Sequence, residues 1–251
     1  MSEVVAWPLG LGILGAIIGS FVAALVVRWP AGRSVMHGRS ACDACSRPLA
    51  PRDLVPLVSA ALLGGRCRTC RAPIDPRHWQ IELLASAIGI VAGIVTPTPL
   101  AIAGATFGWL LLALAALDVA ALWLPDRLTA TLALAGIGTA LAGVPPPLDD
   151  RLIGGAAGFA ALWLVARGYR RIRGREGLGG GDPKLIGAIG LWLGWRMLPA
   201  VLLLASLVGL AVVALAALRG RRMAADAPLP FGALLAVAAY AAWLAMIVIA
   251  S

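Results

Sequence analysis

The chain has 251 residues, of which 61% are hydrophobic and only 13% are charged. A soluble domain has about 45–50% apolar and about 25% charged residues, so this composition excludes a soluble fold of this size. The formal net charge of +9 is also found in nucleic-acid-binding proteins, but here the arginines lie between apolar stretches, where they mark the cytoplasmic side of membrane proteins. We therefore expect the lipid bilayer, and no nucleic acid, as a partner.

Eight apolar stretches are candidates for membrane-spanning helices, which need about 17–25 mostly apolar residues. The first, 4–27, is too long for the apolar core of a cleaved signal peptide, so we expect it to be retained. The fifth and sixth are short and rich in glycine, and we expect neighbouring protein to cover their backbones. The remaining seven stretches are 81–96, 100–118, 128–144, 152–167, 184–196, 198–218 and 231–250.

The basic residues between these stretches predict the orientation of the chain. All lysines and arginines except Arg151 and Arg196 lie in, or directly beside, alternate loops. Because basic residues gather on the cytoplasmic side, those loops are predicted to be cytoplasmic and both termini to face the exterior. The loops are 28–80, 119–127, 168–183 and 219–230.

All four cysteines lie in the polar loop 28–80, as two C-x-x-C pairs that are separated by 21 residues. Two such pairs can bind one tetrahedral Zn²⁺, and a metal can fold a loop that has little core of its own. Disulfides are disfavoured in the cytoplasm, no βαβ pattern supports a redox pair, and four cysteines leave no open position for a catalytic zinc. We predict a structural zinc site formed by Cys42, Cys45, Cys67 and Cys70.

Two of the acidic residues have unusual surroundings. Asp118 follows the apolar run FGWLLLALAAL and precedes VAALWLPD. A carboxylate at bilayer depth is expensive, so it is a functional candidate by default, although a buried acid that only packs helices is the alternative. By contrast, Asp126 follows Pro125 and is expected to cap the next helix.

Asp182 lies in the segment GLGGGDPKLIGAIG. Pro183 suits the first helical position, with Asp182 as the N-cap. A simple cap is the alternative, but the four glycines before Asp182 would let another backbone or a peptide come close. The segment lacks the G-x-G-x-x-G register of dinucleotide sites. The predicted topology places Asp118 and Asp182 at the same cytoplasmic depth, as a pair of catalytic carboxyl groups requires.

These motifs resemble the type IV prepilin peptidase family of GxGD intramembrane aspartyl proteases. The segment LDVAALWLPDRLT (117–129) resembles that of the first catalytic aspartate, and GLGGGDPKL (177–185) that of the second. GSFVAALVVRWP (19–30) resembles the opening motif of the family, and the paired cysteines resemble its zinc loop. The resemblance implies that Asp118 and Asp182 are catalytic, and that Gly179, Gly181 and Lys184 support the active-site loop.

The resemblance also implies a fold, a place and a substrate. It implies an all-α polytopic protein of the bacterial cytoplasmic (inner) membrane, with about eight helices and an active site that faces the cytoplasm. Residues 1–27 would form the first transmembrane helix, 28–80 the cytoplasmic zinc loop and 81–251 the protease core. The enzyme would remove the short basic leader from type IV prepilins or type II secretion pseudopilins.

A second activity is implied by the zinc loop. Members of the family that have this loop commonly also methylate the new N-terminus, with S-adenosylmethionine as the methyl donor. We associate Gly65, just before Arg66 and Cys67, with this activity. An ordinary turn glycine is the alternative for Gly65.

The predicted mechanism has Asp118 and Asp182 share one proton, because two close carboxyl groups do not both ionise readily. The ionised member would act as general base toward a water and the protonated member as general acid. We expect Asp182, at a helix N-terminus, to be the anion and Asp118, near a helix C-terminus, to be the neutral acid. A proton-coupled secondary transporter is the main alternative, since intramembrane acids and glycine-broken helices also occur there. A non-catalytic assembly protein is the third.

Overall fold

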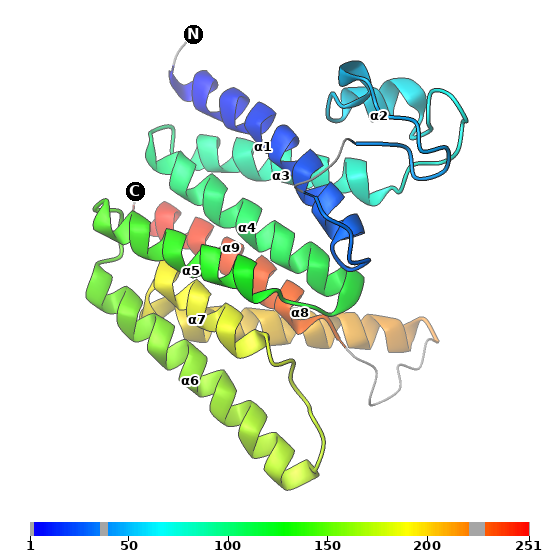
Figure 1. The fold of residues 1–251 in the computed structure, drawn as a ribbon. Coiled ribbons are helices and arrows are strands. Elements are labelled where there is room, and N and C mark those ends of the chain that lie inside the picture. Colours follow the sequence, from blue (N-terminus) through cyan, green and yellow to red (C-terminus); the bar gives the residue numbers. More distant parts are fainter. Residues whose placement is uncertain (1–2, 36–39, 221–228, 251) are drawn as a thin grey trace. The chain divides into compact units, whose positions relative to one another are not determined.

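A computed structural model describes residues 3–35, 40–220 and 229–250. Within these residues the regular elements are helices (Figure 1), together with two isolated β-bridges, so the expected all-α fold is confirmed. The helices form two units, Met1–Ala113 and Leu114–Ser251. These two units are defined by contacts between residues. The expected segments 1–27, 28–80 and 81–251 were instead defined by their expected roles, and that division stays a prediction.

The first unit is built on α1 (Glu3–Arg28) and α3 (Arg77–Val95), which pack against each other over much of their length. Glycines make this close approach possible. A Cβ atom at Gly15 would lie 2.3 Å from the carbonyl oxygen of Ala85, and one at Gly89 would lie 2.1 Å from that of Leu11. Small residues of this kind let membrane helices approach backbone to backbone. Between α1 and α3 the chain forms the cysteine loop, with the short helix α2 (Val58–Leu63) and a 3-10 turn at Pro51–Asp53.

α4 (Leu100–Ala121) runs from the first unit into the second. Its Trp109 donates a 2.8 Å hydrogen bond from Nε1 to the carbonyl of Ala85 on α3. The last turns of α4, which carry Asp118, belong to the second unit. The helices that follow there are α5 (Asp126–Leu141), α6 (Leu148–Arg173), α7 (Asp182–Leu193), α8 (Leu198–Leu218) and α9 (Phe231–Ala250).

α7 is the central helix of the second unit (Figure 1). Ten of its twelve residues are buried, and it contacts α5, α6, α8 and α9. A Cβ atom at Gly190 would lie 2.3 Å from the carbonyl oxygen of Gly154, so α6 and α7 also meet backbone to backbone. Because α7 is enclosed by other helices, the position of its first residue, Asp182, is fixed by packing.

Arg151, near the start of α6, is 1% exposed and forms a hydrogen bond near the C-terminal end of α7. Its guanidinium has no carboxylate partner in the described chain and instead donates to backbone carbonyls and one hydroxyl. The acceptors are the carbonyls of Gly136, Val144, Pro145, Pro146 and Leu191 and the hydroxyl of Thr139. Arg151, one of the two basic residues outside the predicted cytoplasmic loops, is thus a structural residue that connects α5 and the end of α7 to α6.

Among the helices of the described residues, six are long and apolar enough to cross a membrane, namely α1, α3, α4, α6, α8 and α9. The expected count of eight spans is not confirmed, because α5 has 16 residues and α7 has 12. Gly143 (φ +79°) and Gly194 (φ +73°) follow these two helices with positive φ values, which glycine adopts readily and which do not continue a right-handed helix. The fifth expected stretch, 152–167, was wrongly expected to be short, since it lies within the 26 residues of α6.

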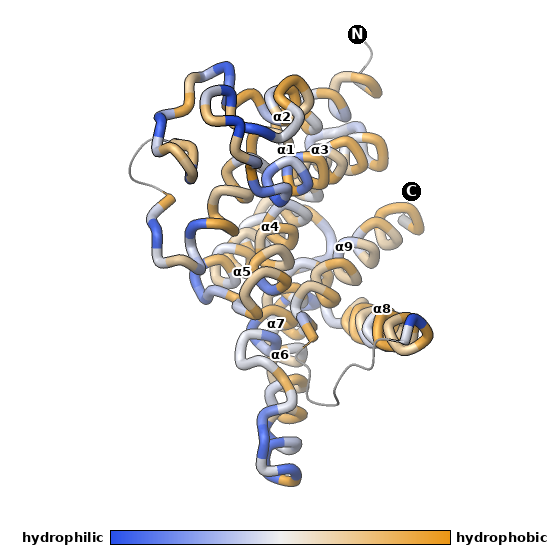
Figure 2. The backbone as a smooth tube through the Cα atoms, turned by 90° about the vertical axis from the view of Figure 1, so that its right-hand side faces the viewer, coloured by the Kyte–Doolittle hydropathy of each residue, from blue (hydrophilic) through white to orange (hydrophobic). Residues whose placement is uncertain are grey.

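Hydrophilic residues are concentrated in the cysteine loop and at one end of α6, whereas the helix bodies are mostly hydrophobic (Figure 2). The last turn of α6 carries Arg170, Arg171 and Arg173. Most of the predicted loop 219–230, with Arg221 and Arg222, lies outside the described residues.

Candidate functional site

Asp118 lies three residues before the end of α4 and is 5% exposed. Its Oδ2 accepts a 2.8 Å hydrogen bond from the backbone N–H of Ala233, in the first turn of α9. A Cβ atom at Gly232 would lie 3.0 Å from the same oxygen, so the glycine leaves room for the carboxyl group. Asp118 therefore lies both at the C-terminal end of α4 and at the N-terminus of α9.

Asp182 is also 5% exposed. It is the first residue of α7, with Gly181 as the N-cap, so the helix begins one residue earlier than predicted. Its Oδ2 accepts a 3.0 Å hydrogen bond from the N–H of Gly179, and its own N–H donates to the carbonyl of Gly179 at 3.1 Å. Gly179 thus contacts Asp182 through two hydrogen bonds, and its expected role in supporting the active-site loop stays a prediction.

Leu124 fills the space beside both carboxyl-bearing segments. A Cβ atom at Gly181 would lie 2.7 Å from Cβ of Leu124, and one at Gly232 would lie 2.8 Å from its Cδ1. The segment after α4, the start of α7 and the start of α9 therefore meet at this side chain. Nothing in the sequence indicated Leu124, Gly232 or Ala233, because a leucine and a backbone N–H carry no recognisable motif.

The two carboxyl groups are within electrostatic range of each other. In the described part of the chain neither forms an ion pair with a lysine or arginine. Asp118 accepts an N–H from the first turn of α9, and Asp182 is in the first turn of α7, so both lie at helix N-termini, where a negative charge is favoured. The expected assignment of charges, with Asp182 as the anion and Asp118 as the neutral acid, stays a prediction.

Lys184, which we expected to support the active-site loop, forms its recorded ion pair with Asp126 and not with Asp118 or Asp182. Its Nζ lies 2.6 Å from Oδ1 of Asp126, and both side chains are exposed. Asp126 is the first residue of α5 rather than its cap. The ion pair therefore connects the beginnings of α5 and α7 at the surface of the unit.

The four cysteines meet as the sequence predicted. Their sulfur atoms all lie within 4.8 Å of one another, with 3.8 Å between those of Cys42 and Cys70. A tetrahedral site with metal–sulfur bonds of about 2.3 Å requires sulfurs about 3.8 Å apart. None of the four forms a disulfide. The cluster can therefore hold a metal ion.

The two C-x-x-C pairs have the same local backbone structure. The N–H of Ser46 donates to the carbonyl of Cys42 at 2.8 Å, and that of Arg71 donates to the carbonyl of Cys67 at 3.0 Å. Ser46 (φ +56°) and Arg71 (φ +59°) both have left-handed conformations at the end of these turns. Backbone N–H groups of such turns are directed at the sulfurs and favour the thiolate form.

The acidity of two thiols shows why a cation suits the cluster. Backbone N–H groups of Cys70 and Thr69 lower the pKa of the Cys67 thiol to about 6. The N–H of Ala72 also lowers the pKa of Cys70, but burial and the hydrogen bonds with the neighbouring sulfurs outweigh it and raise this pKa to about 11. Four thiolates together require a positive ion to compensate their charge.

Ion pairs join the two halves of the loop. Asp53 lies 2.8 Å from Nε of Arg68 and 3.7 Å from Nη2 of Arg47, and the guanidinium of Arg47 also donates to the hydroxyl of Thr69. The hydrogen bond from Arg68 holds the pKa of Asp53 below its usual range. These contacts connect the first cysteine pair to the second without any metal.

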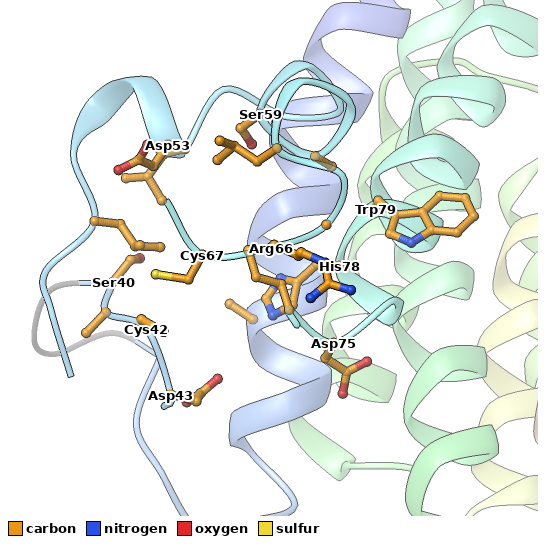
Figure 3. A pocket seen from close by; sticks show the side chains of 18 of the residues that line it. Ser40, Cys42, Asp43, Asp53, Ser59, Arg66, Cys67, Asp75, His78 and Trp79 are labelled. Carbon is orange, nitrogen blue, oxygen red and sulfur yellow. The ribbon is translucent and has the colours of Figure 1, made fainter. Parts of the chain in front are cut away.

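Gly65, which we associated with the second activity, follows α2 and has φ +66°. It lines a cavity of about 410 Å³ between the cysteine loop and the adjoining ends of α1 and α3 (Figure 3). A Cβ atom at Gly65 would meet no atom within 4 Å, so the space beside it is open. A side chain would nevertheless be strained there by the left-handed backbone.

Comparison with known proteins gives consistent results for both units. Residues 13–96 match the bacterial Peptidase A24 N-terminal domain, and residues 105–214 match the type IV leader peptidase family. A protein of Aeromonas salmonicida (strain A449), named prepilin leader peptidase/N-methyltransferase, is 39% identical over 85% of this chain and 72% of its own length. Proteins with the same name from Dickeya chrysanthemi (38% identity, 92% and 90% coverage) and Pseudomonas aeruginosa (34%, 98% and 92%) are also similar. No solved structure matches the chain.

Proposed function

The chain belongs to the type IV leader peptidase family, and on this basis we propose that it removes the short basic leader from type IV prepilins or type II secretion pseudopilins and methylates the new N-terminus. The names of its relatives support both activities. One structural observation carries the peptidase activity: two buried acids, Asp118 and Asp182, are held by backbone N–H groups where α4, α7 and α9 meet.

The proposed hydrolysis uses the two acids as general base and general acid. The ionised carboxyl takes a proton from a water as its oxygen attacks the scissile carbonyl, and the protonated carboxyl donates to the departing amine. Because each carboxyl has a fixed N–H partner on one oxygen, the other oxygen of each remains available for water and substrate. The two carboxyl groups share one proton and titrate as a pair, so the roles of general acid and general base are not fixed to one residue each.

We propose that Leu124 limits access to the acids in the free enzyme. Its side chain lies beside Gly181 and Gly232, which flank the two carboxyl-bearing positions. An extended peptide that reached both acids would displace this side chain. The glycines would then let the peptide backbone approach without a steric clash.

The proposed topology keeps the active site at the cytoplasmic face of the inner membrane. Six helices and the family relationship make the chain a multi-pass membrane protein. α7 is about 18 Å long at 1.5 Å per residue, shorter than the roughly 30 Å hydrocarbon core, and neighbouring helices cover it. The basic end of α6, just before the segment of Asp182, is proposed to lie in the cytoplasm, as the distribution of basic residues predicts.

We propose that the cysteine cluster holds a structural Zn²⁺. Four thiolates in a closed tetrahedral arrangement are the donor set that zinc prefers, and they leave no position for substrate. The fit of the sulfur separations supports this choice. S-adenosylmethionine is the proposed methyl donor for the second activity, and Gly65 is proposed to contribute to that activity.

The transporter alternative finds no support in the comparisons, since the relatives described above are named as peptidases and methyltransferases. The assembly-protein alternative makes a different prediction about cleavage, because it requires no catalytic acid.

A cleavage assay tests the proposed peptidase. The purified chain in lipid nanodiscs is incubated with a prepilin and the released leader is measured. Asp118→Asn and Asp182→Asn should each lose at least about 10³-fold in cleavage rate, as expected for a group that acts directly in the chemistry. Asp149→Asn, which alters an exposed acid in the first turn of α6, should cleave like the wild type. Full cleavage by either catalytic variant would exclude the proposal.

A further inference from the structure

The cavity beside Gly65 has features of a ligand site that the peptidase does not use. It is enclosed by the end of α1, the cysteine loop and the start of α3, and its volume of about 410 Å³ lies in the usual range for small-molecule pockets. Figure 3 shows Cys42 and Cys67 from the loop and His78 and Trp79 from α3 among the side chains of its lining. All of its residues belong to the first unit, whereas both catalytic aspartates belong to the second.

The acids that line this cavity differ in their partners. Three of them form ion pairs with arginines, namely Asp43 with Arg33, Asp53 with Arg68 and Asp75 with Arg77. The fourth, Glu82, is only 7% exposed and forms no ion pair within the described residues. Its recorded hydrogen bond is a 2.8 Å contact from the N–H of Leu57 to Oε2. Glu82 lies within electrostatic range of the imidazole of His78, but no lysine or arginine of the described residues pairs with it. A buried carboxylate of this kind beside a cavity indicates a cationic ligand.

We propose that this cavity binds the methyl donor S-adenosylmethionine, with Glu82 as the counterion of its positive charges. The inference rests on the proposed methyltransferase activity and assigns it a place and a binding residue. The donor carries a sulfonium and an ammonium group, which suit Glu82, and a carboxylate, which suits the guanidinium of Arg66 in the same lining. The donor is a polar molecule from the aqueous phase, and a cavity in the polar loop is accessible to it.

When bound, the donor supplies a methyl group to the amine of the new N-terminus. The nitrogen lone pair forms the new C–N bond, the electrons of the broken C–S bond stay on sulfur, and the amine proton passes to a base. His78, one turn before Glu82 on the same face of α3, lines the cavity and provides an imidazole that can accept this proton.

The same geometry assigns the metal cluster a role in the second activity. Cys42 and Cys67 belong to the wall of the cavity, and Gly65 is two residues from Cys67. A metal that fixes the four sulfurs therefore also fixes one side of the donor site. Loss of the metal is expected to open that wall and to abolish donor binding.

The experiment measures binding directly by isothermal titration calorimetry of the full chain in nanodiscs. The probes are sinefungin, which carries an amine in place of the sulfonium, and S-adenosylhomocysteine, which lacks that charge. Glu82→Gln keeps an oxygen that accepts from Leu57 and removes only the negative charge. It should weaken sinefungin at least about tenfold and S-adenosylhomocysteine less, with metal content and prepilin cleavage unchanged. Asp75→Asn, which alters an acid that Arg77 already neutralises, should weaken either probe less than threefold.

A second variant guards against a purely structural effect of Glu82. Ala24→Trp places a large side chain in the lining of the cavity from α1, whereas Glu82 is on α3, and should prevent binding of both probes while cleavage continues. If Glu82→Gln or Ala24→Trp binds both probes as tightly as the wild type, the cavity is not the donor site. If the wild type cleaves prepilin but binds neither probe, the methyltransferase part of the proposed function fails, and this inference fails with it.

Discussion

The backbone N–H of Ala233 donates a 2.8 Å hydrogen bond to Oδ2 of Asp118, and so joins the end of α4 to the first turn of α9. These residues are far apart in the sequence. The contact gives Asp118 a fixed orientation and a helix N-terminus, which favours its charged form. Asp182 is itself the first residue of α7 and accepts from the N–H of Gly179, in the segment before that helix. Each acid of the proposed active site is therefore held by one backbone N–H, Asp118 by a residue of α9 and Asp182 by the segment that precedes its own helix.

The glycine beside this hydrogen bond should be required for activity. In Gly232→Ala, the new Cβ would lie 3.0 Å from the Asp118 carboxyl and 2.8 Å from Leu124. The carboxyl must then shift, and small displacements of a catalytic group reduce rates by about 10- to 100-fold. We expect such a fall in the rate of prepilin cleavage in nanodiscs.

Gly138→Ala is the matched control for that variant. Gly138 lies within α5, and a Cβ atom there would meet no atom within 4 Å. It should cleave at the wild-type rate and be as stable or slightly more so, because alanine favours helix by up to about 1 kcal/mol. Equal rates for both glycine variants would show that Asp118 does not depend on its place beside α9.

The Lys184–Asp126 ion pair should contribute little to catalysis. Both side chains are exposed, and exposed pairs contribute roughly 0.2–1 kcal/mol. We expect Lys184→Met to reduce cleavage less than about threefold, and a double-mutant cycle with Asp126→Asn to give a coupling within that range. A loss of a hundredfold or more in Lys184→Met would instead mean that Lys184 acts on the substrate or on the acids.

Arg151 should be among the most important residues for stability. It is 1% exposed and donates to carbonyls at the ends of α5 and α7, which would be left unsatisfied in Arg151→Met. We expect a loss of about 3 kcal/mol in unfolding free energy, measured as a reduced thermal midpoint in nanodiscs. Arg196→Met, which removes a largely exposed arginine, should change the midpoint little. Similar midpoints for the two variants would contradict the structural role of Arg151.

Removal of the metal should separate the two activities. All the contacts that hold Asp118 and Asp182 lie within the second unit, whereas the cysteines form part of the first. We expect Cys67→Ser to lose bound zinc, measured by mass spectrometry, and to lose methylation completely while a measurable part of the cleavage rate remains. Methylation at the wild-type rate in a zinc-free variant would show that the metal does not shape the donor site.

The sequence predicted those features that have a local signature. Four cysteines in two C-x-x-C pairs indicate their own cluster, and Asp118 is conspicuous as an acid within an apolar run. The partners of these acids could not be predicted, because Ala233 contributes only a backbone N–H and Leu124 only its volume. Both come from segments whose contacts depend on how α4, α7 and α9 pack.

The lengths of two helices were harder to predict for another reason. Residues 184–196 are apolar, and an apolar stretch of this length is compatible with a short span or with a helix buried in protein. The structure shows the second case, with α7 enclosed by its neighbours. The end of α5 depends on the left-handed turn at Gly143, which hydrophobicity alone does not reveal.

The central claim, that Asp118 and Asp182 work as one unit, is tested most directly by combining their substitutions. The cleavage rates of Asp118→Asn, Asp182→Asn and the double variant are measured on one prepilin in the same nanodiscs. Groups that act as a unit are strongly non-additive, so the double variant should be no slower than either single one. Losses that multiply, or a single variant that keeps more than about a tenth of the wild-type rate, would contradict the account.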